Sequence, residues 1–261
     1  MSLTAILIDG EFCLHRMQAC YKDLDFDNPV EVADEIHKMA WRHLYPNKKD
    51  SQLQTHDLYR IFFYDCMPLS KKHACYPISK ERIDFSRTKT SQFRTQLHKE
   101  LVKKRKVALR LGEISSSSSW QLYDNSLKQL IKGQKQWTDL EDKDFRYNIT
   151  QKGVDMRIGL DIASLALKKQ VNQIVLISGD SDFVPAAKLA RREGIDFILD
   201  PMWSQKIPDH LSEHIDGIQS VCPKPSSNKD TSYLERIFED NSFMPDCPKP
   251  SSYKDTTHDT P

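Results

Sequence analysis

Short apolar segments alternate along this chain with longer segments of helical periodicity, and no other feature constrains the fold as strongly. The apolar segments lie at residues 3–8, 58–64, 107–111, 174–177 and 197–199. Segments with helical spacing of apolar residues lie at 31–44, 90–105, 155–169 and 184–192. Apolar runs this short are typical of strands that are buried on both faces. The alternation therefore predicts a three-layer α/β/α domain around a mostly parallel central sheet.

The length of 261 residues fits one large α/β domain followed by a tail. We place the domain at 1–220 and the tail at 221–261. The tail contains the segment CPKPSSNKDT from Cys222 and a near copy, CPKPSSYKDT, from Cys247. Two copies are too few for a solenoid, and the composition favours a flexible segment. We interpret the tail as a candidate docking segment for a protein partner.

Composition excludes several classes of protein. The six cysteines form no C-x-x-C pair and are too sparse for a disulfide scaffold, which favours a reducing, cytoplasmic setting. No run of about 18 apolar residues is present, so we expect no membrane span. No G-x-G-x-x-G follows the first strand, so we expect no dinucleotide cofactor. The histidines show no spacing that indicates a zinc site.

Aspartates follow the predicted strands at three places. Asp9 comes directly after the first strand, Asp155 enters a helix after Lys152-Gly-Val, and Asp180 and Asp182 belong to the run Ser178-Gly-Asp-Ser-Asp-Phe. In a parallel α/β sheet the strands end, and the returning helices begin, at one common edge. The four aspartates are therefore expected to converge there, although they are far apart in sequence.

Converging carboxylates repel one another, and a bound cation removes that conflict. Hard oxygen ligands suit Mg²⁺ or Mn²⁺, and such a metal can orient a phosphate and lower the pKa of a bound water. Each aspartate also has a structural interpretation, since Asp9 can open a turn and the others can cap helices. Asp161 lies about 9 Å further along the helix than Asp155, where it supports the site or pairs with a Lys or Arg.

Two motifs make this sequence resemble the NYN family of PIN-like nucleases. They are the run KGVDMRIGLDIA from Lys152 and the run ISGDSDFVP from Ile177, preceded by Ile8-Asp-Gly, and the resemblance covers roughly 3–220. It implies a PIN-like fold and metal-dependent ribonuclease chemistry. Asp9, Asp155 and Asp180 are then the core metal ligands and Asp182 supports the site. Lys152 faces a phosphate or the acids, and Ser178 shapes the strand-end turn.

The resemblance further implies hydrolysis by attack of a metal-activated water on phosphorus, which leaves a 5′-phosphate product. One departure from the family pattern stands at the first acid. Family members often carry an Asn shortly after it, whereas Gly10-Glu11-Phe12 follows Asp9 here. Glu11 is the polar group available to take that place.

A basic stretch suggests how RNA is held. Residues 71–110 contain 13 Lys or Arg and 3 acids, in a chain whose formal net charge is only +1. Such patches bind phosphate backbones with an affinity that falls with salt. The predicted RNA-binding residues are Lys71, Lys72, Lys80, Arg82, Arg87 and Lys89, with Tyr76 and Phe85 in a predicted loop as stacking partners for bases. The alternative for Lys99 to Lys106 is a solvated helix face.

Three other functions compete with a ribonuclease. A haloacid-dehalogenase-like phosphatase also ends a strand in Gly-Asp, but it starts with D-x-D where this chain has Asp9-Gly10-Glu11. A topoisomerase-primase type domain would use Asp180-x-Asp182, but it expects a Glu after the first strand. A catalytically silent module would keep the fold and bind RNA or a protein without cleavage. Failure to bind Mn²⁺ would favour this last interpretation.

Overall fold

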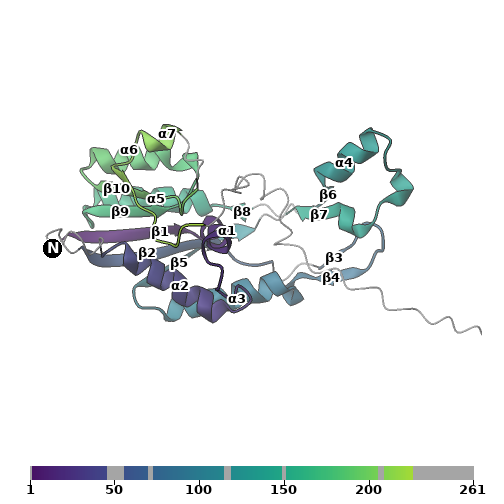
Figure 1. The fold of residues 1–261 in the computed structure, drawn as a ribbon, viewed down its shortest axis with the longest axis horizontal. Helices are drawn as coiled ribbons and strands as arrows, with labels where there is room; N and C mark the ends of the chain where they lie inside the picture. The colour runs from purple at the N-terminus through teal and green to yellow at the C-terminus, as the bar shows by residue number, and fades with distance from the viewer. Residues whose placement is uncertain are drawn as a thin grey trace, which may run out of the picture.

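The structure is a computed structural model, and it describes residues 2–45, 56–69, 73–114, 119–148, 151–204 and 209–225. Lys71, Lys72, most of the serine run 115–119 and the tail beyond 225 lie outside these residues, and so do both copies of the tail repeat except for positions 222–225. Figure 1 shows a sheet flanked by helices, with a smaller lobe that projects from one end.

A seven-stranded sheet forms the centre of the molecule, in the order β11-β10-β9-β1-β2-β5-β8. The strands are β1 (Leu3–Asp9), β2 (Asp57–Cys66), β5 (Val107–Ile114), β8 (Gln151–Lys152), β9 (Gln173–Ile177), β10 (Asp196–Asp200) and β11 (Gly217–Ile218). Six run parallel, and the edge strand β8 pairs antiparallel with β5. The predicted mostly parallel sheet is confirmed, and β1 is its central strand.

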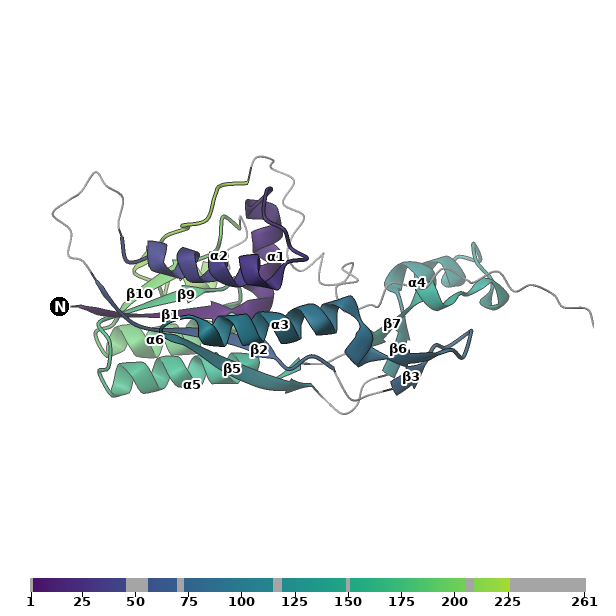
Figure 2. The ribbon, with the colours of Figure 1, turned by 90° about the horizontal axis from the view of Figure 1, so that it is seen from below.

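Helices cover both faces of the sheet (Figure 2). The helices on one face are α1 (Gly10–Cys20), α2 (Pro29–Arg42) and α3 (Lys89–Lys103), and those on the other are α5 (Val154–Leu167), α6 (Val184–Arg192) and α7 (Asp209–Ser212). The core beneath α1, α2 and α3 is called the first core, and the core beneath α5, α6 and α7 the second core. In β1, Ile6 and Ile8 point into the first core, whereas Ala5 and Leu7 point into the second. This period of two, with all four of these residues apolar, explains why residues 5–8 show no polar face.

Helix α1 begins directly after Asp9, where the sequence suggested only a turn. The Asp9 carboxylate caps the helix by accepting a hydrogen bond of 3.2 Å from the Phe12 N–H. A Cβ atom on Gly10 would lie 2.5 Å from the Tyr64 carbonyl oxygen, so only glycine lets the helix start this close to β2. Helical spacing over 10–20 is weak because apolar and polar residues mix around the helix.

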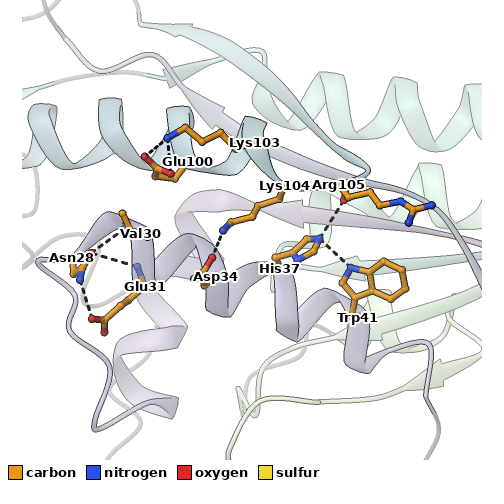
Figure 3. Close-up of polar contacts among 10 residues, drawn as sticks. All are labelled: Asn28, Val30, Glu31, Asp34, His37, Trp41, Glu100, Lys103, Lys104 and Arg105. Carbon is orange, nitrogen blue, oxygen red and sulfur yellow. Dashed lines mark hydrogen bonds and ion pairs between the residues drawn. The ribbon is translucent and has the colours of Figure 1, made fainter.

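Helices α2 and α3 are joined by polar contacts, shown in Figure 3. Lys104 pairs with Asp34, and the His37 Nε2 atom lies 3.2 Å from the Arg105 carbonyl oxygen. Lys103 binds Glu100 within α3. These lysines lie near the start of β5, at the edge of the sheet opposite Asp9. Their charges are thus engaged within the fold, away from the acids.

The projecting lobe consists of two small antiparallel ribbons and a helix, inserted after β2 and after β5 (Figures 1 and 2). Its elements are β3 (His73–Cys75), β4 (Arg82–Asp84), β6 (Ser119–Leu122), α4 (Asp124–Ile131) and β7 (Phe145–Asn148). Sequence patterns left residues 120–147 unassigned, since no period of two or 3.6 extends over more than a few residues there.

An aromatic cluster holds the two ribbons of the lobe together. The rings of Phe85 and Tyr147 lie 4.8 Å apart, and those of Tyr76 and Trp120 lie 5.2 Å apart. Tyr76 is 9% exposed and Phe85 only 2%. These two side chains, predicted to lie in a loop and to stack on bases, form the core of the lobe instead.

No helix in the described parts of the chain is both long enough and apolar enough to cross a bilayer.

Candidate active site

Asp9 lies at the end of the central strand, on the edge of the sheet that faces the lobe. One of its oxygens caps α1, and the other accepts a hydrogen bond of 3.2 Å from the Ser178 hydroxyl. Ser178 is fully buried at the end of the neighbouring strand β9. The two strand ends are therefore joined through the Asp9 carboxylate itself.

The loop after β9 turns tightly around Ser178. The Asp180 N–H donates to the Ser178 hydroxyl at 3.3 Å, and the Asp182 N–H donates to the Asp180 carboxylate at 3.0 Å. Asp180 thereby caps the short 3₁₀ helix η4 (Ser181–Phe183). Phe183 is buried and anchors the loop on the second core. Asp180 itself is only partly buried.

The Phe12 ring packs closely against the backbone of Gly179. Phe12 is 1% exposed, and a Cβ atom on Gly179 would lie 2.6 Å from its ring. The residue that replaces the expected polar side chain after the first acid is thus a core residue that packs beneath the β9 loop. Glycine at position 179 leaves room for it.

Asp155 stands in the first turn of α5, two residues beyond the N-cap Gly153, so it does not cap the helix itself. Gly153 has a φ of 80°, a left-handed conformation that glycine adopts without strain. Gly112 lets this segment approach β5, since a Cβ there would lie 2.8 Å from the Lys152 carbonyl oxygen. These two glycines allow α5 to start at the same edge of the sheet as Asp9.

The electrostatics of this edge are dominated by like charges. Burial raises the pKa of Asp9 to about 7, and the negative charges of Glu11 and Asp155 add to this effect against the hydrogen bonds from Phe12 and Ser178. Burial and the charges of Asp180 and Asp182 raise the pKa of Asp155. Within the part of the chain that the structure describes, no Lys or Arg pairs with any of these four aspartates.

These four carboxylates, called the acid cluster below, fit a hard divalent cation by their chemistry. They offer oxygen ligands only, they repel one another, and Asp9 is poorly stabilised as an anion without a counter-charge. Among the described residues, no three His, Cys, Asp or Glu side chains already stand close enough to enclose an ion. An ion would therefore have to draw the carboxylates of the acid cluster together.

Three other predicted site residues, Glu11, Lys152 and Asp161, differ in how they relate to the acid cluster. Glu11 is in the first turn of α1 and acts electrostatically on Asp9. Lys152 is exposed on β8, three residues before Asp155. Asp161 pairs with Arg110 at 3.0 Å and accepts a hydrogen bond of 2.9 Å from the Tyr64 hydroxyl, which holds α5 on the sheet.

A buried charge network beside the acid cluster was not predicted. Asp65, at the end of β2, accepts hydrogen bonds of 2.7 and 2.8 Å from Arg94 and lies 2.8 Å from the His98 Nε2 atom. Although burial favours the neutral acid, the Arg94 charge and the His98 contact lower the pKa of Asp65. The position of Asp65 directly after the second apolar segment indicates in the sequence that it stands at a strand end. No periodicity shows that α3 supplies its partners Arg94 and His98.

The predicted RNA-binding residues that the structure describes lie around the β3–β4 ribbon and the start of α3. Lys80, Arg82, Arg87 and Lys89 are all exposed. Lys80 donates to the Pro77 carbonyl oxygen at 2.6 Å, and Arg87 lies 3.4 Å from Asp84. All four belong to the end of the molecule that carries the acid cluster.

Comparison with known proteins supports the resemblance seen in the sequence. The family model described as "NYN domain" matches residues 95–218, a range that contains Asp155, Asp180 and Asp182 but not Asp9. A crystal structure of a protein of unknown function from Vibrio parahaemolyticus RIMD 2210633 covers 84% of this chain and 93% of its own, at 16% identity and a TM-score of 0.39. No curated protein gives a significant match.

Proposed function

We propose, on the premise that this chain carries a NYN domain of the PIN-like nuclease superfamily over residues 95–218, that it is a metal-dependent ribonuclease. The observation that carries the proposal is the acid cluster, in which four carboxylates follow the strand ends and no ion pair to a Lys or Arg is found among the described residues. Such an arrangement costs stability unless a cation is bound, so a structural role alone does not account for it.

Asp9, Asp155 and Asp180 would hold the divalent cation, Mg²⁺ or Mn²⁺, and Asp182 would support it from the loop. When bound, such an ion orients a phosphate and makes water a stronger nucleophile at neutral pH. The protein would contribute the positions of these groups. Ser178 fixes the orientation of Asp9 through its hydroxyl, and the cap on η4 fixes Asp180.

Binding an ion at Asp9 requires that its carboxyl group lose its proton. Because burial and neighbouring charges raise the pKa of Asp9 to about 7, a substantial fraction is protonated at neutral pH without metal. Lys152, exposed three residues before Asp155, can reach a phosphate of the substrate as a point charge. The exposed cations of the β3–β4 ribbon would hold the RNA backbone further along the same end of the molecule.

The test is incubation of the pure protein with labelled RNA in Mn²⁺, Mg²⁺ or EDTA, beside the variant Asp180→Asn. Asparagine can still cap η4, so the variant should melt as the wild type does, whereas cleavage should fall to background. Asp196→Asn, at the opposite edge of the sheet, is the matched control and should cleave normally. Equal cleavage by the Asp180 variant would refute the role assigned to the acid cluster.

A second candidate function is a catalytically silent module that binds RNA. It is favoured by one observation, namely that no three potential ligands among the described residues are already spaced to enclose an ion. This candidate predicts salt-sensitive RNA binding that does not depend on Mn²⁺, with no cleavage product under any metal condition.

A further inference from the structure

A pocket opens where the sheet meets the lobe. It comprises about 410 Å³ of empty space, its open mouth included, between the end of β2, the first turn of α3, η1 (Phe85–Arg87) and the end of β5. Every one of these segments leads from the sheet to the lobe or back (Figures 1 and 2). Ligand sites in proteins are often built at such junctions.

The walls of the pocket are largely apolar, with a few polar groups on one side. Leu69, Phe85 and Ile114 supply apolar surface, and Thr90 and Ser91 supply hydroxyl groups from the start of α3. The walls are rigid on both sides. Phe85 is fixed by its ring contact with Tyr147, and the start of α3 is fixed by the Thr88 side chain, which accepts from the Ser91 N–H at 3.2 Å.

The pocket adjoins the acid cluster. Asp65 and Cys66, which line it, are the last two residues of β2, and β2 pairs directly with the strand that ends in Asp9. Arg94, which also lines it, interacts electrostatically with both Glu11 and Asp9. A chain of nucleotides with one phosphate at the acid cluster would therefore have a neighbouring nucleotide near the mouth of this pocket.

We propose that this pocket receives one nucleobase of the RNA whose backbone lies at the acid cluster, an inference that rests on the proposed ribonuclease function. A base has two apolar faces and a polar edge, which matches apolar walls with hydroxyl groups on one side. A phosphate matches less well, because the positive charge of Arg94 is already balanced by Asp65 through two hydrogen bonds. Phe85, as a wall of the pocket, would then contact the base, whereas Tyr76 does not line the pocket.

The first experiment uses labelled RNA of one sequence in which each position in turn lacks its base. The wild-type protein should cut one of these RNAs about tenfold more slowly than the intact RNA, as expected for the loss of one buried base. The affected position should lie next to the cleaved bond. Equal rates for all abasic RNAs would overturn the proposal.

The second experiment fills the pocket. Thr90→Trp places an indole ring in the wall, and Thr95→Trp, on the exposed side of the same helix, is the matched control. Thr90→Trp should slow cleavage of intact RNA about tenfold and add no further loss on the sensitive abasic RNA. If both tryptophan variants behave alike, or if the two losses multiply, the pocket does not hold that base.

A metal-free measurement separates failure of this proposal from failure of the ribonuclease function. Fluorescently labelled RNA is titrated with the Asp180→Asn protein in EDTA, where no cleavage occurs. Adding Thr90→Trp should weaken binding of intact RNA about tenfold but leave binding of the sensitive abasic RNA unchanged. If the wild type cleaves nothing, the sensitive abasic RNA is instead the one that the Asp180→Asn protein binds about tenfold more weakly than the intact RNA, so this titration still decides the proposal. Unchanged affinity for intact RNA would overturn it.

Discussion

At the scale of single residues, Asp9 is subject to two conflicting influences. It caps α1, binds Ser178 and stands at the end of the central strand, yet its surroundings disfavour its charge. A residue kept in such a place stabilises the fold most when it is protonated. The same residue becomes a good ligand only when a cation replaces the proton.

This conflict predicts a pH dependence in the absence of metal. The pKa of Asp9 rises from an ordinary 3.8 to about 7 on folding, so the folded state holds the proton more tightly than the unfolded state. Its stabilising contribution is present below about pH 4 and is lost as the pH rises through 7. In EDTA, the free energy of unfolding of the wild type, relative to Asp9→Asn, should fall between about pH 4 and 7 and stay level above that. A difference that stays constant with pH would contradict this.

Tyr76 and Phe85 show why only part of the site could be predicted from the sequence. The positions of Asp9 and Asp180 at strand ends could be predicted, because strand ends follow from apolar runs and parallel sheets share one edge. The burial of Tyr76 and Phe85 could not, since it depends on Trp120 and Tyr147, which come from the other ribbon of the lobe. Contacts between distant short ribbons leave no periodic signal in either segment.

At the scale of elements, the network of Asp65, Arg94 and His98 joins α3 to the end of β2. Asp65 is 2% exposed, so removal of its carboxylate would leave the Arg94 charge buried without its main partner. We expect Asp65→Ala to lower the free energy of unfolding by about 3–5 kcal/mol. Because the pKa of Asp65 is lowered in the folded state, its stabilisation is present above about pH 4 and is lost at lower pH.

The control for this prediction is the more exposed ion pair between α2 and α3 in Figure 3. Asp34 pairs with Lys104 but its side chain is 43% exposed, so Asp34→Ala should cost less than about 1 kcal/mol. Chemical denaturation of the two variants measures both values. Similar losses for both would show that the Asp65 network is not the main tie between α3 and the sheet.

The segments predicted at 107–111 and 197–199 correspond to β5 and β10, whereas α1, α4 and the strands of two to four residues were not predicted. Strands β1, β2 and β9 and helices α2, α3, α5 and α6 all lie where apolar spacing placed them, to within a few residues at each end. Helix α1 was missed because its buried face includes Arg16 and Gly10, which interrupt an apolar pattern. The strands of the lobe have three or four residues each, too few for a period to be recognised.

At the scale of the whole molecule, the family match begins within α3, whereas the sheet is built around β1. The acid cluster therefore combines Asp155 and Asp180 from the matched range with Asp9 from outside it. The lobe lies beyond the edge that carries these residues (Figure 1). We interpret the lobe as the part of the molecule that guides RNA toward the acid cluster.

This interpretation predicts that RNA binding is salt-dependent and that the cations on the lobe side determine the slope. Each phosphate contact contributes roughly −0.7 to the slope of log K against log salt for single strands. Replacing Arg82 and Lys89 by alanine should make the slope less steep and weaken binding. The control replaces Lys99 and Lys103, which lie further along α3 toward the opposite edge, and should leave the slope unchanged. A slope near zero in the wild type would exclude the basic stretch as the RNA track.

The proposed ribonuclease function depends on binding of a divalent ion by the acid cluster, and calorimetric titration with Mn²⁺ tests this most directly. We predict saturable binding by the wild type and by Asp196→Asn, and its loss in both Asp9→Asn and Asp180→Asn. The account is contradicted if the wild type shows no saturable heat, or if the two site variants bind Mn²⁺ as tightly as the wild type.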